Sequence, residues 1–122
     1  MSEADWDYQL DTNLKAMFLT CREAVKLMRV NGNGSIINIS SVQAMASQQT
    51  VAPYAASKGG VISFTRSIAL DYAADGIRAN AVLPGSVETP MLRAAGEQFN
   101  PSDPDGAMKN WGALHPLGFL IQ

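Results

Sequence analysis

A chain of 122 residues, 47% of them hydrophobic, can bury one core but is shorter than a typical two-layer enzyme domain. Nine basic and eleven acidic residues give a slightly acidic balance without a basic run, so we expect no nucleic-acid partner. The single cysteine excludes an intrachain disulfide, no apolar stretch reaches the roughly twenty residues of a membrane helix, and no metal site is predicted.

The N-terminal part of the chain predicts two helical segments. Ser2 and Asp5 have the spacing of a capping box, so a short helix is expected to begin there. This acidic opening lacks the charged and apolar regions of a signal peptide, which favours a cytoplasmic location. From Asn13 to about Asn31-Gly32, an apolar residue recurs every three or four positions, which indicates a long amphipathic helix.

Two strands joined by a helix are predicted next. The β-branched run Ile36 to Ile39 is typical of a strand buried on both faces of a parallel sheet. Residues 42 to 52 are small or polar, and we expect a loop over the site there. Pro53 suits the first turn of a helix that runs toward Gly76, and Ile77 to Leu83 forms the second strand. These elements make one right-handed βαβ crossover with a parallel pair of strands.

Glycines mark two further features. The pair Gly59-Gly60 lies inside the predicted helix and costs about 1 kcal/mol per residue relative to alanine, so another backbone or a neighbouring subunit is expected to approach there. After Gly85 and the run Val87 to Leu92 comes a segment up to about Gly106 that is rich in Pro, Gly and Asp, and such segments are often mobile flaps. In the run before this segment, Thr89 precedes Pro90 and could cap a helix.

Three side chains between the predicted strands form a candidate reaction centre. Tyr54 and Lys58 are four residues apart, so they lie on one face of the helix, one turn from each other. An ammonium group at this distance favours the ionised form of a phenol. Ser41 follows the first strand, at the sheet edge where open α/β folds bind their ligands. A hydroxyl, a phenol and a cation can therefore converge on one carbonyl oxygen.

Three ordered motifs carry a family resemblance: Asn38-Ile39-Ser40-Ser41, Tyr54-Ala55-Ala56-Ser57-Lys58 and Asn80-Ala81-Val82-Leu83-Pro84-Gly85. From about Trp6 to Gly118 the chain resembles the short-chain dehydrogenase/reductase family. The order of the motifs makes the resemblance specific, since the five-residue pattern from tyrosine to lysine alone would often occur by chance. The resemblance implies an α/β, Rossmann-like fold with parallel strands and crossover helices, and an oxidoreductase that uses NAD or NADP.

The resemblance also implies catalytic roles. Tyr54 would be the acid/base that exchanges a proton with the oxygen of a secondary alcohol or ketone, while hydride passes between nicotinamide and the substrate carbon. Lys58 would bind the nicotinamide ribose hydroxyls. Ser41 would hold the substrate oxygen as charge develops on it. Asn13 would help to bind a water that links the lysine to solvent.

Other residues are expected to line the cofactor and substrate sites. Pro84, Gly85, the backbone near Val87 and the hydroxyl of Thr89 match the part of the family that meets the nicotinamide carboxamide. Two residues are expected near the substrate. Gln43 is a polar residue near the expected pocket, and Met91 belongs to the segment that closes over the substrate in the family.

Several of these residues have a second interpretation. Ser40 competes with Ser41 as the site hydroxyl, and the thirteen-residue offset to Tyr54, as in the family, favours Ser41. Asn13 could instead cap the long helix, a role compatible with water binding. Cys21 falls on the apolar stripe and is expected to pack in the core. His115, in the predicted turn His115-Pro116-Leu117-Gly118, is given no catalytic role.

The sequence lacks the Gly-rich turn that receives a dinucleotide pyrophosphate in Rossmann folds. Gly32-Asn33-Gly34 precedes a strand where that turn should follow one, so it is rejected as a phosphate loop. Residues 1 to 122 are therefore interpreted as the catalytic half of a Rossmann-type domain, truncated at both ends, which alone neither binds cofactor tightly nor turns over. An intact member is expected to be a homo-oligomer. The alternative hypothesis is a non-catalytic interaction module that dimerises through its two long helices.

Overall fold

The computed structural model describes residues 1 to 121 and has an α/β fold, as the sequence predicts. The chain forms two compact units, Met1–Leu83 and Pro84–Gln122, each described by itself below. Among residues 1 to 121, no helix combines the length and the apolar character that crossing a membrane would require.

The first unit begins with one nearly continuous helical rod. It consists of α1 (Glu3–Leu10), a π-helical turn (Asp11–Lys15) and α2 (Ala16–Asn31). The predicted capping box is confirmed, because the Ser2 hydroxyl accepts from the Asp5 amide and the Asp5 carboxylate accepts from the Ser2 amide. α2 ends at Gly32, whose φ of 67° is a left-handed conformation that favours glycine.

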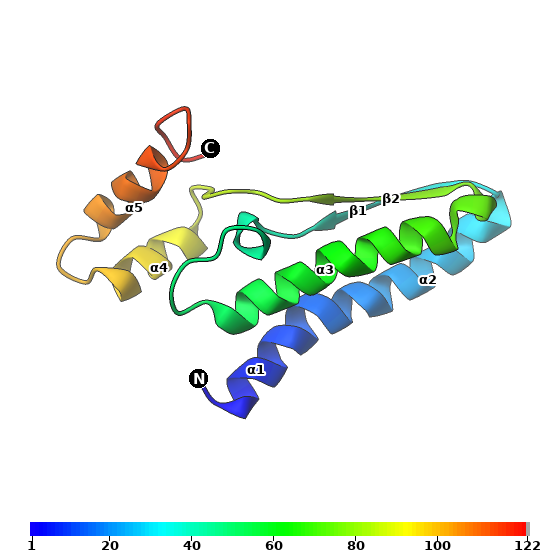
Figure 1. Cartoon of the computed structure of the whole chain (residues 1–122), viewed down its shortest axis with the longest axis horizontal. Coiled ribbons are helices and arrows are strands. Elements are labelled where there is room, and N and C mark those ends of the chain that lie inside the picture. The colour runs from blue at the N-terminus through cyan, green and yellow to red at the C-terminus, as the bar shows by residue number, and fades with distance from the viewer. Residues whose placement is uncertain (122) are drawn as a thin grey trace. The chain divides into compact units, whose positions relative to one another are not determined.

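A parallel pair of strands, β1 (Gly34–Ile39) and β2 (Ile77–Val82), follows the rod. Gly34 pairs with Ile77, and the register continues to Ile39 opposite Val82. The connection between the strands contains a short 3₁₀ turn (Val42–Ala44), α3 (Ala52–Asp71) and a second 3₁₀ turn (Ala73–Asp75). The predicted strand–helix–strand crossover with a parallel pair is therefore confirmed (Figure 1).

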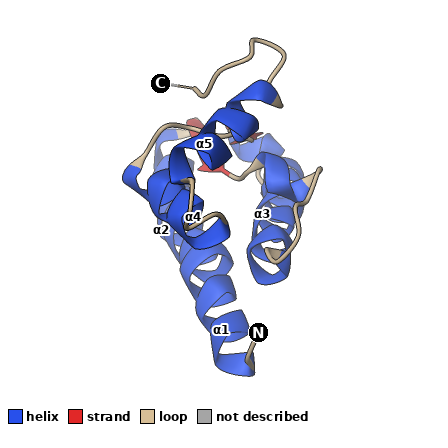
Figure 2. Cartoon of the chain, turned by 90° about the vertical axis from the view of Figure 1, so that its left-hand side faces the viewer, coloured by secondary structure: helices blue, strands red, loops and turns tan. Residues whose placement is uncertain are grey.

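The core of this unit lies on one face of the sheet. Both α2 and α3 run beneath that face (Figures 1 and 2). The buried cluster contains residues from both strands and both helices: Cys21, Val25, Ile36, Ile68 and Ile77. Cys21 thus packs in the core, as predicted.

The prediction that the first strand is buried on both faces is wrong for this chain. Ile37 is 64% exposed and Ile39 is 48% exposed, while their neighbours Ile36 and Asn38 are buried. Side chains alternate between the two faces of a strand, and α2 and α3 cover only one of them. An apolar run of this kind identifies the strand, but it does not show that the same chain supplies both covering layers.

The two adjacent glycines of α3 differ in their surroundings. A Cβ atom on Gly60 would lie 2.7 Å from Cδ2 of Leu14, so the close neighbour there is a side chain of the π-helical turn and not the predicted backbone or neighbouring subunit. A Cβ atom on Gly59 would meet nothing within 4 Å among the described residues, so that position is open within this chain, and the approach of a neighbouring subunit there stays a prediction.

The second unit contains two packed helices, α4 (Pro90–Phe99) and α5 (Pro104–Ala113). Thr89 and Asp103 cap them, and the rings of Phe99 and Trp111 meet edge to face with centroids 6.0 Å apart. The segment predicted as a flap up to Gly106 is thus largely helical. Both helices begin with a proline, a residue that suits a first helical turn, so a segment rich in proline can still form helices.

The chain after α5 returns to the start of the second unit. The predicted turn at His115 is confirmed, because the Gly118 amide donates to the His115 carbonyl oxygen over 2.8 Å. Beyond it, Ile121 forms an isolated parallel bridge with Val87. Two main-chain bonds support this bridge, from Glu88 to Ile121 and from Ile121 to Ser86.

Candidate active site

Lys58 lies in α3 and reaches the end of β1. Its Nζ donates to the carbonyl oxygen of Ile39, the last residue of the strand, over 3.0 Å. One residue further, the hydroxyl of Ser40 donates to the main-chain carbonyl oxygen of Lys58 over 2.7 Å. Two hydrogen bonds therefore join this turn of α3 to the carboxyl end of the strand.

Tyr54 lies one helical turn before Lys58, as the spacing predicts. The Lys58 ammonium is 5.8 Å from the centroid of the Tyr54 ring, within the range of a cation–π contact. Burial disfavours the charged ammonium and lowers the pKa of Lys58 below the ordinary lysine value. The structure thus brings the predicted phenol and cation together.

Ser41 and Ser40 have different hydrogen-bond partners. Ser41 is 7% exposed, and its Oγ accepts from the Gln43 amide at the start of the 3₁₀ turn. Ser40 uses its O–H to bond the Lys58 carbonyl oxygen. Among the interactions of residues 1 to 121, no acceptor takes the Ser41 O–H, so that hydrogen is not committed within the described part of the chain. Of the two competing serines, the geometry favours Ser41.

Asn13 does not cap a helix, contrary to one of its two interpretations, because it lies inside the π-helical turn Asp11–Lys15. Its Nδ2 donates to Oε1 of Gln9 over 3.0 Å and to Oγ of Ser57 over 3.1 Å. Both hydrogens of the amide are therefore used within the protein, which leaves the side-chain carbonyl oxygen to accept from a water.

Ser57 is a residue of the site that the sequence did not single out. It is fully buried, and its own O–H donates to the Tyr54 carbonyl oxygen over 2.7 Å. The chain Gln9, Asn13, Ser57 and Tyr54 thus connects the N-terminal rod to the tyrosine turn of α3. The only sequence signal was its place directly before Lys58 in the motif.

Gln43 organises the loop that follows Ser41. Its main-chain amide donates a hydrogen bond to Oγ of Ser41, and its main-chain carbonyl oxygen accepts from the Ser47 hydroxyl over 2.7 Å. Its side-chain Oε1 accepts from the Gln48 amide over 2.8 Å. These bonds commit the side-chain oxygen of Gln43 to the loop and leave its Nε2 as the group able to donate to a ligand.

The remaining predicted site residues lie in the second unit. Gly85 packs against the His115 ring so closely that a Cβ atom would overlap it, and the Ser86 amide donates to Nε2 of His115 over 3.1 Å. The His115 ring therefore packs against Gly85 and accepts a hydrogen bond from the next residue, a structural role. In the sequence, Pro84 precedes these two residues and Val87 follows them. Val87 forms the bridge to Ile121.

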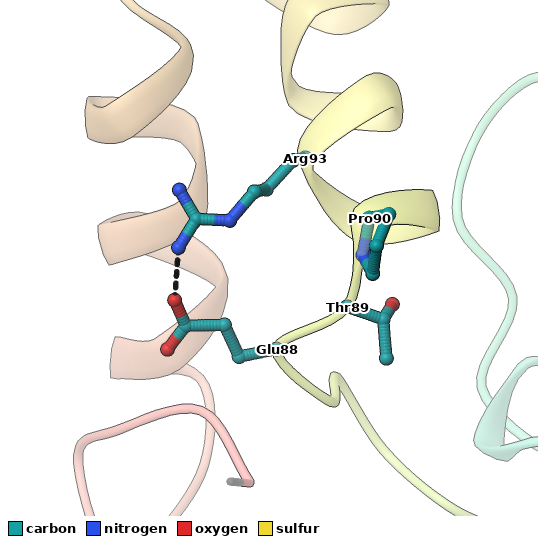
Figure 3. A pocket seen from close by; sticks show the side chains of 4 residues that line it. All are labelled: Glu88, Thr89, Pro90 and Arg93. Carbon is teal, nitrogen blue, oxygen red and sulfur yellow. Dashed lines mark hydrogen bonds and ion pairs between the residues drawn. The ribbon is translucent and has the colours of Figure 1, made fainter.

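Thr89 and Met91 lie at the start of α4. The Thr89 hydroxyl oxygen accepts from the Leu92 amide over 3.2 Å, which confirms its capping role, while Met91 is 79% exposed. An open hollow is lined by Glu88, Thr89, Pro90 and Arg93, and an ion pair joins Arg93 to Glu88 (Figure 3). The close approach of Gly85 to His115 and the hollow beside Thr89 were not predicted.

The first unit is thus part of a Rossmann-type α/β fold with a tyrosine, a lysine and a serine at the carboxyl end of a parallel strand. The family profile described as short chain dehydrogenase matches residues 1 to 100. The chain belongs to the short-chain dehydrogenase/reductase family, an oxidoreductase family, as the motifs predict.

Similar proteins extend well beyond the length of this chain. Levodione reductase of Leifsonia aquatica is 34% identical over 113 residues, which are 93% of this chain and 42% of the relative. Ligand-free aldohexose dehydrogenase of Thermoplasma acidophilum superposes with a TM-score of 0.92 and 37% identity, covering 99% of this chain and 48% of that one. Actinorhodin polyketide ketoreductase with NADPH gives a TM-score of 0.90 and 34% identity, covering 100% of this chain and 49% of that one. The chain spans about half the length of the relatives it matches.

Proposed function

We propose that this chain supplies the catalytic half of an oxidoreductase that uses NAD or NADP to interconvert a secondary alcohol and a ketone. The observation that carries the proposal is the Lys58 ammonium held beside the Tyr54 ring, at the strand end that Ser41 follows. The names of similar proteins support it, since they include a reductase of levodione and a ketoreductase with NADPH.

The side chains suit the two ligands. Lys58 Nζ has three donors and gives one to Ile39, so two remain for the ribose hydroxyls of a nicotinamide cofactor. Ser41 donates to the carbonyl oxygen of the ketone, and Tyr54 gives that oxygen a proton as the alcohol forms. The cofactor supplies the hydride. In the reverse direction, Tyr54 takes the proton from the alcohol.

The second unit carries further residues with proposed ligand contacts. The main chain after Pro84 and Gly85, near Val87, and the Thr89 hydroxyl would bind the nicotinamide carboxamide. The Thr89 oxygen accepts within the α4 cap, so its O–H remains able to donate to that group. Gln43 would donate from Nε2 to a polar group of the substrate. Met91, which is 79% exposed, would supply apolar contact.

We infer that the 122-residue chain alone is inactive and binds cofactor weakly. Dinucleotide affinity in Rossmann folds depends on a Gly-rich turn that leads from a strand into a helix N-terminus, where backbone amides receive the pyrophosphate. The sequence has no such turn. Thermal unfolding of the chain is expected to be insensitive to NADH and NADPH, and a clear cofactor-dependent stabilisation would contradict the inference.

A chimera tests the proposed chemistry. A segment that carries a Rossmann Gly-rich turn is fused before Met1, and NAD(P)H-dependent ketone reduction is measured. Tyr54→Phe is expected to lower kcat by about 10²- to 10⁴-fold, the usual contribution of a general acid. Tyr8→Phe, at a tyrosine that is 67% exposed in α1, is the matched control and should leave the rate unchanged.

The outcomes of this experiment separate assembly from chemistry. NADPH fluorescence shows whether the folded chimera binds cofactor. A chimera that binds cofactor and reduces ketones equally well with tyrosine or phenylalanine at position 54 would refute the role of Tyr54.

A second candidate function is self-association through the two long helices. α2 exposes Leu27 by 71% and Val30 by 84%, and α3 exposes Leu70 by 80%. Large exposed apolar side chains on packed helices favour an interface with a second copy. Light scattering after size-exclusion chromatography is expected to show a dimer that Leu27→Lys weakens. A monomer at the highest soluble concentration would remove this candidate.

A further inference from the structure

The hydroxyl of Ser40 is buried where β1 meets α3, and the proposed reaction does not use it. Ser40 is 3% exposed, and its Oγ donates to the Lys58 main-chain carbonyl oxygen over 2.7 Å. Carbonyl groups inside an α-helix already accept from the amide four residues later. The Ser40 bond is therefore an addition that the formation of α3 does not require.

The Lys58 side chain forms a second tie to the same strand. Its Nζ donates to the carbonyl oxygen of Ile39, the residue directly before Ser40. The Ser40 side chain holds the main chain of Lys58, and the main chain of Ile39 holds the side chain of Lys58. Together they limit both the position of this helical turn and the rotamers of a flexible four-carbon stem.

We propose that Ser40 is a positioning residue that holds Lys58 against the end of β1 and so directs its ammonium toward Tyr54 and the ligand. The role rests on the proposed oxidoreductase function. This proposal also gives the two adjacent serines different roles. Ser40 gives its O–H to the lysine turn, whereas Ser41 keeps its O–H for the substrate oxygen.

The ionisation of Lys58 reports on this arrangement. Burial lowers the pKa of Lys58, and the titratable group beside it is Tyr54. No carboxylate within residues 1 to 121 forms an ion pair with Lys58. If Ser40→Ala releases the turn, the ammonium gains contact with water, and the pKa of Lys58 rises toward the ordinary lysine value of about 10.4.

The test is an NMR titration of the 122-residue chain labelled with ¹³C at the lysine ε carbons. The chain has four lysines, Lys15, Lys26, Lys58 and Lys109, and the signal of Lys58 is the one lost in Lys58→Arg. Ser40→Ala is expected to shift the Lys58 titration upward. Ser40→Thr retains a hydroxyl and should titrate like the wild type. Ser35→Ala changes an exposed serine of β1, the strand that Ser40 follows, and should also have no effect.

An unchanged Lys58 titration in folded Ser40→Ala overturns the proposal. If circular dichroism shows that Ser40→Ala is unfolded, Ser40→Cys replaces it, because a thiol fills a similar space but donates weakly. An upward shift then supports the proposal, and an unchanged titration overturns it. The titration needs neither cofactor nor turnover, so its failure is distinguishable from a failure of the Tyr54→Phe test in the chimera.

Discussion

The side-chain amide of Asn13 donates to the buried hydroxyl of Ser57 over 3.1 Å and joins the π-helical turn to α3. The direction of this bond is fixed, because the only hydrogen of the Ser57 hydroxyl is given to the Tyr54 carbonyl oxygen. A π-helical turn carries one extra residue in its hydrogen-bonded ring, and such turns often occur near functional sites. Here the turn presents an amide to the helix that bears the tyrosine.

Removal of the Ser57 hydroxyl should weaken the packing of α3 against the π-helical turn. Ser57→Ala loses the bond to Asn13 and leaves a half-buried amide hydrogen without its partner, so the free energy of unfolding should fall by about 1–2 kcal/mol. Urea unfolding measures the change. Ser63→Ala, at an exposed serine of the same helix, is the control and should be neutral. Equal stabilities for the two variants would show that the bond contributes nothing.

Much of the first unit could be predicted because its signals are local. The capping box at Ser2, the apolar stripe through Cys21, and the alternation of strand and helix each depend on a few neighbouring residues. The spacing of Tyr54 and Lys58 predicts their proximity for the same reason, since helical geometry alone sets it.

The failures concern relationships between distant segments. Asparagine is a common helix cap, but the partner of Asn13 is Ser57, which lies 44 residues away in the sequence. Patterns among neighbouring residues could not identify this partner. Ile36 and Ile37 are the same type of residue, and only the placement of the helices shows that Ile36 is covered and Ile37 is exposed. The two serines after β1 are likewise identical in type. Their roles separate only when Ser40 is seen to bond Lys58.

The two glycines of α3 provide a paired test of helix docking. Gly59→Ala places a Cβ atom in open space and restricts the unfolded chain, so it should stabilise the protein by about 0.5–1 kcal/mol. Gly60→Ala gains the same propensity but forces Leu14 to move, at a cost of about 1–3 kcal/mol. Chemical denaturation should rank Gly59→Ala above Gly60→Ala. The reverse order would show that Leu14 does not pack against this position.

The cap of α4 can be tested within the second unit. Thr89→Ala removes the oxygen that accepts from the Leu92 amide and should destabilise the first turn of α4 by about 1 kcal/mol. Hydrogen exchange of the Leu92 and Arg93 amides should accelerate accordingly. Thr89→Ser keeps the hydroxyl and should retain slow exchange. Fast exchange in both variants would indicate that the threonine methyl group, rather than its oxygen, stabilises the turn.

The buried thiol of Cys21 should make stability depend on pH in the alkaline range. Burial raises the pKa of Cys21, so the folded chain keeps the thiol proton at pH values where the unfolded chain loses it. The folded state then binds more protons than the unfolded state, and the free energy of unfolding falls as pH rises above about 8.5, by at most about 1.4 kcal/mol per pH unit. Lys58 contributes the opposite slope, since a lysine whose pKa is lowered on folding binds fewer protons in the folded state.

The comparison with Cys21→Ala isolates the thiol, because the lysine contribution is common to both proteins and cancels in the difference. At neutral pH the variant should be less stable, since a side chain that is 4% exposed leaves a small cavity when shortened. The advantage of the wild type over the variant should shrink between about pH 7 and pH 9.5, as the unfolded thiol ionises. Urea unfolding of both proteins at the two pH values measures it. A difference that does not change with pH would mean that the thiol ionises as readily in the folded chain as in the unfolded one.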